Sequence, residues 1–200
     1  MKQLAIIGAS GHGKVVADIA RLIGYDDIVF LDDNEAVKSC GKYPVIGRAE
    51  PALIHDRDYF VAIGESDTRS RLMEAFGTER CVTLIHPNAT IAEDVSIGLG
   101  TVVMAGTVIN PGTRIGMGCI INTCSSVDHD CTIGDYCHIS VGAHLSGSVI
   151  VGNKTWIAVG ASVANNVAIS SNCVIGAGAV VIRDVDDSGT YVGAPARKIR

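Results

Sequence analysis

The chain has 200 residues, of which 48% are hydrophobic and 18% charged, and its formal net charge is −5. This composition is typical of a globular protein with one large or two small domains. No cluster of Lys and Arg could follow a phosphate backbone, so we expect no nucleic-acid partner. The apolar runs are far shorter than the roughly 20 residues that cross a bilayer, so we expect no membrane insertion.

The N-terminus and the cysteines point to a cytoplasmic protein. Met1 leads directly into an apolar strand pattern, without the basic region and long apolar core of a secretion signal. The seven cysteines are odd in number and include no C-x-x-C pair. We therefore expect small, buried, reduced thiols in a reducing compartment.

Residues 1–85 alternate short apolar runs with helix-like stretches, which predicts a βαβ domain. Strands are expected over residues 2–7, 28–31, 59–63 and 82–85. Helices are expected over residues 14–23 and from a cap at Ser66 or Asp67 to about residue 76. A glycine-rich turn, Gly8 to Gly13, joins the first strand to the first helix.

That turn has the composition of a phosphate-binding loop. Glycines let a backbone approach a ligand, and a helix N-terminus favours negative charge. The spacing is G-x-x-G-x-G, whereas dinucleotide enzymes carry G-x-G-x-x-G, so an NAD enzyme is disfavoured. Asp32 follows the second strand, where an acidic side chain can meet a ribose or a base. A solvated turn carboxylate is the alternative for Asp32.

From Ile91 onward the sequence has a six-residue period. Every sixth residue from Ile91 to Val181 is a branched aliphatic, and the residue four places after each is small or β-branched, from Val95 to Val185. Sixteen hexads in phase, over residues 91–186, predict a parallel β-helix with three hexads per coil and a little over five coils. The second domain is therefore expected over residues 86–200, including a C-terminal tail.

Several motifs resemble known acyltransferases. The hexads and the closing run Val192-Gly193-Ala194-Pro195-Ala196-Arg197 resemble the hexapeptide-repeat acyltransferases. The segments Gly8-Ala9-Ser10-Gly11-His12-Gly13, Phe30-Leu31-Asp32-Asp33 and Ala62-Ile63-Gly64 resemble the bacterial nucleotide-sugar acetyltransferases. These include the UDP-4-amino-sugar N-acetyltransferases of bacillosamine synthesis and the sialic acid O-acetyltransferases. The resemblance implies a Rossmann-like α/β domain followed by a left-handed β-helix, a homotrimer, acetyl-CoA as co-substrate and no metal.

In this family the N-terminal domain holds the nucleotide-sugar. By resemblance, the contacts are expected from Ser10, Gly11, His12, Asp32, Asp33 and Gly64. His12 has the alternative role of capping the following helix. Many relatives carry Gly-Asn-Asn or Gly-Asp-Asn where this chain has Gly64-Glu65-Ser66, so the identity of the sugar stays open.

Acetyl transfer to an amine or hydroxyl needs a base, and histidine is the commonest choice near neutral pH. His129 lies in a segment, Asn122 to Asp130, that resembles the catalytic segment of the family. It stands outside the core register of its hexad and can face a groove. Asp130 matches the acidic residue that orients the histidine, and Asp128 is a rival for that role. The resemblance also gives Asn122 the task of holding the acceptor.

Acetyl-CoA contacts are expected further along the β-helix. His138 matches a family residue that contacts acetyl-CoA, and His144 follows six residues later. Val159, Gly160, Ala177 and Gly178 would line a groove for the pantetheine arm, although the repeat itself also demands small residues.

The leading hypothesis is N-acetylation of a UDP-linked 4-amino-dideoxy sugar by direct attack, since no cysteine or serine is marked as an activated nucleophile. O-acetylation of a sialic or related sugar is the nearest alternative. A β-helix zinc enzyme that uses His129, His138 and His144 as ligands belongs to a different class. A non-catalytic sensor of nucleotide-sugars is a further alternative.

Overall fold

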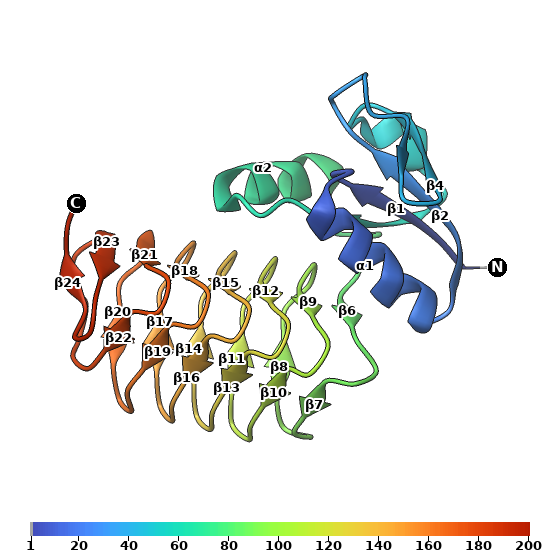
Figure 1. The fold of residues 1–200 in the computed structure, drawn as a ribbon. Helices are drawn as coiled ribbons and strands as arrows, with labels where there is room; N and C mark the ends of the chain where they lie inside the picture. Colours follow the sequence, from blue (N-terminus) through green and yellow to red (C-terminus); the bar gives the residue numbers. More distant parts are fainter. Residues whose placement is uncertain (1) are drawn as a thin grey trace. The chain divides into compact units, whose positions relative to one another are not determined.

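The computed structural model describes residues 2–200, which form two compact units that adjoin at Pro87 and Asn88 in the sequence. The expected boundary lay two residues earlier. Figure 1 shows an α/β unit followed by a stack of short strands. No helix among residues 2–200 has both the length and the apolar character needed to cross a membrane.

The first unit is built on a five-stranded sheet with the order β3-β4-β2-β1-β5. All neighbouring strands are parallel except β3 and β4. The strands are β1 (Lys2–Ile7), β2 (Tyr25–Leu31), β3 (Ser39–Cys40), β4 (Tyr43–Gly47) and β5 (Asp58–Val61), with β6 (Leu84–Ile85) following outside this sheet. The helices are α1 (Gly11–Leu22), the 3-10 turn η1 (Pro51–Ile54) and α2 (Ser66–Phe76).

Three details of this unit differ from the expectation. Helix α1 begins at Gly11, inside the predicted turn, and Gly13 in its first turn packs where a Cβ would collide with the carbonyl oxygen of Gly8. The cap of α2 is Glu65, whose carboxylate accepts from the amides of Asp67 and Thr68. Strands β3 and β4 were not predicted because β3 has only two residues and β4 contains Pro44, which is unfavourable within a strand.

The second unit is the left-handed β-helix. Each strand from β7 to β19 pairs in parallel with the strand 18 residues later, which is one coil of three hexads, as Ile109 pairs with Val127. One sheet contains β7 (Thr90–Ile91), β10 (Val108–Ile109), β13 (Ser126–Val127), β16 (His144–Leu145), β19 (Ser162–Val163) and β22 (Val180–Val181). The second contains β8 (Ser96–Ile97), β11 (Arg114–Ile115), β14 (Thr132–Ile133), β17 (Ile150–Val151) and β20 (Ala168–Ile169). The third contains β9 (Val102–Val103), β12 (Ile120–Ile121), β15 (His138–Ile139), β18 (Trp156–Ile157), β21 (Cys173–Ile175), β23 (Gly189–Val192) and β24 (Arg197–Lys198).

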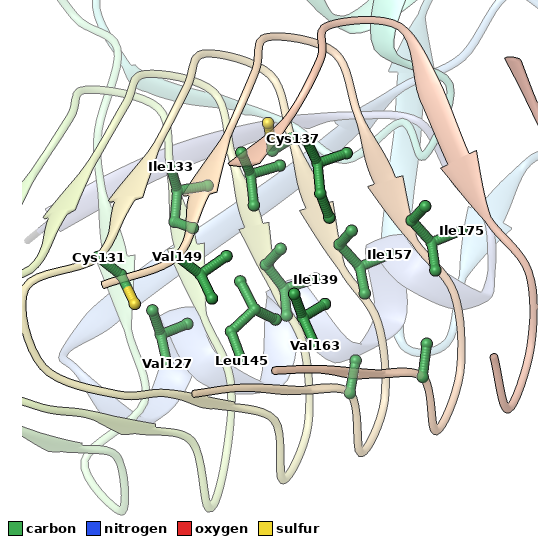
Figure 2. Packing of buried hydrophobic residues seen from close by; sticks show 14 of the residues in the cluster. Val127, Cys131, Ile133, Cys137, Ile139, Leu145, Val149, Ile157, Val163 and Ile175 are labelled. Carbon is green, nitrogen blue, oxygen red and sulfur yellow. The ribbon is translucent and has the colours of Figure 1, made fainter. Parts of the chain in front are cut away.

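The interior of the prism is filled by the two predicted sets of side chains. Figure 2 shows aliphatic residues such as Ile139 and Leu145 beside small residues such as Cys137 and Val149. Buried hydroxyls among the small residues are satisfied by carbonyls, as in the bond from Thr107 Oγ1 to the oxygen of Asn122 at 3.0 Å. The sixteen hexads therefore form one continuous apolar core.

The corners of the coils need a left-handed backbone. From Gly100 to Gly178, the fourth residue of every hexad has φ between 54° and 74°, and half of these residues are not glycine. Cys124 occupies one such corner and is exposed, whereas the other six cysteines are buried. The expectation of buried thiols is therefore wrong for Cys124, because the corner position directs its side chain out of the core.

Candidate active site

His129 lies at the corner between β13 and β14, and its side chain is 54% exposed. Its Nδ1 forms a 2.8 Å hydrogen bond with Oδ2 of Asp130. Asp130 is one of the left-handed corner residues, and Asp tolerates that conformation better than most residues do. Of the two candidate carboxylates, Asp130 is thus the one that contacts the imidazole ring.

Asp128 is held in a different way. Its Oδ1 accepts from the backbone nitrogen of His129 at 2.9 Å and from Nδ2 of Asn110, one coil earlier, at 2.7 Å. Asp128 is therefore fixed beside His129 without a hydrogen bond to the ring. Sequence analysis missed Asn110, although it stands 18 residues before Asp128 in the same register.

These carboxylates make the imidazole more basic. The hydrogen bond from Nδ1 of His129 to the carboxylate of Asp130 and, second, the negative charge of Asp128 raise the pKa of His129. The bond from Asn110, followed by the amide of His129, lowers the pKa of Asp128. Asp128 is thus negatively charged at neutral pH. A neutral His129 with its proton on Nδ1, facing Asp130, has a lone pair on Nε2 that can accept a proton.

The ring of His129 also lies against Gly147, one coil later. A Cβ added at Gly147 would come within 2.5 Å of Nε2 and 2.6 Å of Cε1 of His129. The imidazole can occupy its place only because residue 147 has no side chain. Sequence analysis missed this contact too, since glycine is common throughout the repeat.

The residues expected to bind acetyl-CoA gather on another edge of the prism. Val159-Gly160 and Ala177-Gly178 form the same corner on successive coils, joined by a 2.9 Å bond from the nitrogen of Gly178 to the oxygen of Val159. All four residues are exposed. The two glycines have open space around the Cβ position, so the edge is accessible along its length.

His138 and His144 flank this edge from neighbouring sheets. Nδ2 of Asn122 lies 3.1 Å from Nε2 of His138, and the His138 ring stacks on the indole of Trp156 with centroids 5.9 Å apart. A 2.8 Å hydrogen bond joins Nδ1 of His144 to Oγ of Ser126. Asn122 and His138 are therefore brought together, whereas His129 lies at a different corner of the same chain.

The expected nucleotide contacts of the first unit follow the carboxyl ends of β1, β2 and β5, the edge where parallel sheets bind ligands. The carboxylate of Asp32 accepts from the backbone nitrogens of Ala9, at 2.8 Å, and Asn34, at 2.9 Å. Asp32 therefore closes the turn after β2 onto the glycine loop. Ser10 and Gly11 are exposed at the start of α1, and Asp33 accepts from Ala49.

His12 is half-buried in this loop, and its Nε2 has no hydrogen-bond partner among the described residues. Burial and, second, the charge of Arg69 lower the pKa of His12 to about 4, so the imidazole is neutral near pH 7. Arg69 is fully buried, and its guanidinium donates to the carbonyls of Ile63 and Gly64 at 2.8 Å. Arg69 thus fixes the chain after β5, a role that its sequence position did not suggest.

The three histidines of the zinc hypothesis have separate partners: Asp130 for His129, Asn122 for His138 and Ser126 for His144. Within residues 2–200, no three His, Cys, Asp or Glu side chains are grouped so that they could hold a metal ion. Residues 2–200 therefore provide no ligand set for the zinc hypothesis.

Comparisons with known proteins agree with this geometry. Residues 3–76 match the family model described as the PglD N-terminal domain. Over 113 residues the chain is 39% identical to UDP-N-acetylbacillosamine N-acetyltransferase of Bacillus subtilis (strain 168); the match covers 52% of each sequence, about half the length of that relative.

Solved structures cover the whole chain. The acetyltransferase domain of PglB from Neisseria gonorrhoeae FA1090, in complex with acetyl coenzyme A, is 40% identical with a TM-score of 0.93, and 99% of each chain is covered. PerB from Caulobacter crescentus, in complex with CoA and GDP-perosamine, is 38% identical with a TM-score of 0.91, covering 99% of this chain and 97% of the other. This chain belongs to the hexapeptide-repeat nucleotide-sugar acetyltransferases.

The fold and family predicted from sequence are therefore confirmed. In this member of the family, the motifs that carried the resemblance lie in both units: the glycine loop in the α/β unit, and the segment around His129 in the β-helix. Structures of perosamine N-acetyltransferase with one histidine replaced by asparagine or alanine have also been solved with CoA and GDP-perosamine.

Proposed function

We propose that this protein transfers the acetyl group of acetyl-CoA to the 4-amino group of a UDP-linked amino-dideoxy sugar, with His129 as general base. The observation that carries the proposal is the 2.8 Å bond between Nδ1 of His129 and Asp130, which leaves Nε2 to take a proton. The relatives named above, which act on or bind UDP-N-acetylbacillosamine-type and GDP-perosamine sugars, support the substrate class.

The reaction follows from these groups. The amine nitrogen attacks the thioester carbonyl while Nε2 of His129 accepts its proton, and Asp130 stabilises the imidazolium. The new C–N bond forms, the C–S bond breaks, and CoA leaves as a thiolate that is protonated to the thiol. Cys131, the cysteine closest in sequence to His129, is buried, and burial raises the pKa of its thiol. Its inaccessibility favours direct attack without an acetyl-enzyme.

Release of CoA thiol should be measured with UDP-4-amino sugars, GDP-perosamine and sialic acids as acceptors. We expect turnover on a UDP-4-amino sugar, a loss of about 10²-fold or more in His129→Ala, and no change in His55→Ala, an exposed histidine of the first unit. Preference for GDP-perosamine would show that the sugar is carried by GDP instead of UDP. Turnover only on a hydroxyl acceptor would replace N-acetylation by O-acetylation, and acetylated protein trapped during turnover would overturn direct attack.

We further propose a homotrimer in which each active site combines two copies. In one chain, His129 and the edge formed by Val159-Gly160 and Ala177-Gly178 lie at different corners of the prism. Large apolar side chains such as Trp156, Val159 and Ile182 are also about half exposed. Sedimentation equilibrium should give about three times the chain mass of 20.8 kDa. A mass equal to one chain would contradict this assembly.

We place the enzyme in the cytoplasm, where acetyl-CoA and nucleotide-sugars are made. The free cysteines, six of them buried, agree with a reducing compartment. Fractionation of cells that express the tagged chain should recover it with cytoplasmic proteins. Recovery in the secreted fraction would contradict this placement.

A further inference from the structure

Asn110 and Asp128 occupy the same place in successive coils, because β10 and β13 pair with Ile109 opposite Val127. The backbone holds both residues. The nitrogen of Asn110 donates to the oxygen of Val127, and the nitrogen of Asp128 donates to the oxygen of Leu145, each at 3.0 Å. The two side chains leave the prism one above the other, at the corner that carries His129.

The side chains of Asn110 and Asp128 are hydrogen-bonded, with Asn110 as donor and Asp128 as acceptor. The amide of Asn110 donates to Oδ1 of Asp128 at 2.7 Å, and the backbone nitrogen of His129 donates to the same oxygen at 2.9 Å. Two donors that converge on one oxygen leave the carboxylate little rotational freedom. The charge of Asp128 is thereby held beside His129, while the ring nitrogen bonds to Asp130.

We propose that Asn110 is a positioning residue of the catalytic centre: it fixes the Asp128 carboxylate so that Asp128 stabilises the imidazolium formed when His129 accepts the substrate proton. This inference rests on the proposed role of His129 as base. Asn110 has no hydrogen bond to the imidazole and acts through Asp128. A charge that is already oriented costs no reorganisation during the reaction, which is why its fixation increases the rate.

The surroundings of His129 leave few other charges to perform this task. Asp128 and Asp130 are the carboxylates of its own corner. Two coils earlier, Asp94 is turned to the nitrogen of Gly112, which donates to its Oδ2 at 2.9 Å. The other residues of the adjacent corners are uncharged: Pro111, Gly112, Gly147 and Ser148. The titration of His129 therefore reports mainly on Asp128 and Asp130, which agrees with the causes of its raised pKa.

The test is to compare the wild type with Asn110→Ala by NMR titration of the His129 Cε1 proton and by steady-state kinetics. We expect the His129 titration to move to lower pH, and kcat to fall by about tenfold with KM for both substrates unchanged. Asn153→Ala is the matched control, because Asn153 also bridges two coils, accepting from the nitrogen of Asp135 at 2.9 Å, but at another corner. It should leave both readouts unchanged.

A double-mutant cycle tests whether Asn110 acts through Asp128. Asp128→Asn should reproduce the shift, and Asn110→Ala should add nothing in that background. An unchanged His129 titration in Asn110→Ala, or fully additive effects, would overturn the inference. The proposed function would still stand in that case if His129→Ala were inactive in the same assay. Should Asn110→Ala not fold, Asn110→Ser, whose hydroxyl is too short to reach Asp128, replaces it.

Discussion

Nδ1 of His129 is hydrogen-bonded to one carboxylate oxygen of Asp130, and this bond is the main cause of the raised pKa of His129. A general base works only when unprotonated, so kcat/KM should be lost as pH falls through that raised pKa. Asp130→Asn keeps the left-handed corner but removes the charge. We expect the acid limb of the pH profile to move to lower pH, and the plateau to fall on the order of 100-fold.

The measurement is kcat/KM for the amino sugar from about pH 5 to about pH 9, for both proteins. An acid limb at the same pH in the wild type and in Asp130→Asn would show that Asp130 does not tune the base.

His12 makes a separate prediction about stability. Its pKa is lowered to about 4 in the folded protein, against about 6.5 in an unfolded chain, so the unfolded state binds more protons between these values. The contribution of a neutral His12 to the free energy of unfolding is therefore present above about pH 6.5 and is lost as pH falls towards 4. Between pH 7 and pH 5 the free energy of unfolding should fall by about 2 kcal/mol from this residue.

Urea unfolding at the two pH values checks this difference. His12→Gln should lack that part of the pH dependence, whereas His55→Gln, at an exposed histidine of the same unit, should retain it. Equal pH dependence in the wild type and His12→Gln would contradict the assignment.

The coils of the β-helix place side chains 18 residues apart in contact, and Gly147 beneath His129 is one example. In Gly147→Ala, the new methyl group should displace the imidazole, because a ring at the end of a side chain moves more easily than the coil. We expect kcat to fall on the order of 100-fold, with the free energy of unfolding changed by less than about 1 kcal/mol.

Kinetics of Gly147→Ala alone and combined with His129→Ala test the contact. The glycine substitution should have no further effect once the imidazole is absent. A similar loss in both backgrounds would mean that Gly147 acts independently of His129.

The strands and core of the β-helix could be predicted from sequence because each hexad carries the same physical constraint. The aliphatic residue must fill the core, and the residue four places later must fit beside it, as Ile139 and Ala143 do. The contacts between coils could not be predicted in the same way. Period six does not reveal which carboxylate turns to the ring of His129. Asp128 and Asp130 both adjoin it, but Asp128 is bonded to Asn110 on the preceding coil and Asp130 bonds to the ring.

The α/β unit was less predictable. Its central strands contain continuous apolar runs, whereas β4 is interrupted by Pro44 and β3 has only two residues. In the sequence, Arg69 resembles an ordinary charged residue of a helix. It is nevertheless fully buried, because carbonyl oxygens after β5 accept hydrogen bonds from its guanidinium. The family resemblance predicted which residues of this unit contact the nucleotide-sugar, whereas the structure adds the groups that hold the chain after β5.

We propose that the two substrates are bound mainly by different units, and a charge-matched pair of variants tests this division. Ser10→Glu places a carboxylate at the exposed start of α1, where the substrate phosphates are expected, and an acidic residue there suits the helix. Val159→Glu places the same charge on the exposed edge proposed for the pantetheine arm. We expect about a tenfold rise in KM, for the nucleotide-sugar in the first variant and for acetyl-CoA in the second.

Each variant should leave the KM of the other substrate unchanged, which steady-state kinetics with one substrate saturating will show. If Ser10→Glu weakened acetyl-CoA instead, the proposed assignment of the two sites would be wrong.

The unbroken run of left-handed corners from residue 100 to residue 178 limits how such a chain can change in length. Loss of one residue would rotate every later aliphatic side chain out of the prism. Loss of six residues would keep the aliphatic side chains in the core but move each later strand to the next of the three sheets. Only a change of 18 residues restores both phase and face, at one strand spacing of about 4.8 Å along the axis. We therefore expect homologues to lengthen or shorten this part by whole coils, so that the distance from the corner of His129 to the chain end varies in discrete steps.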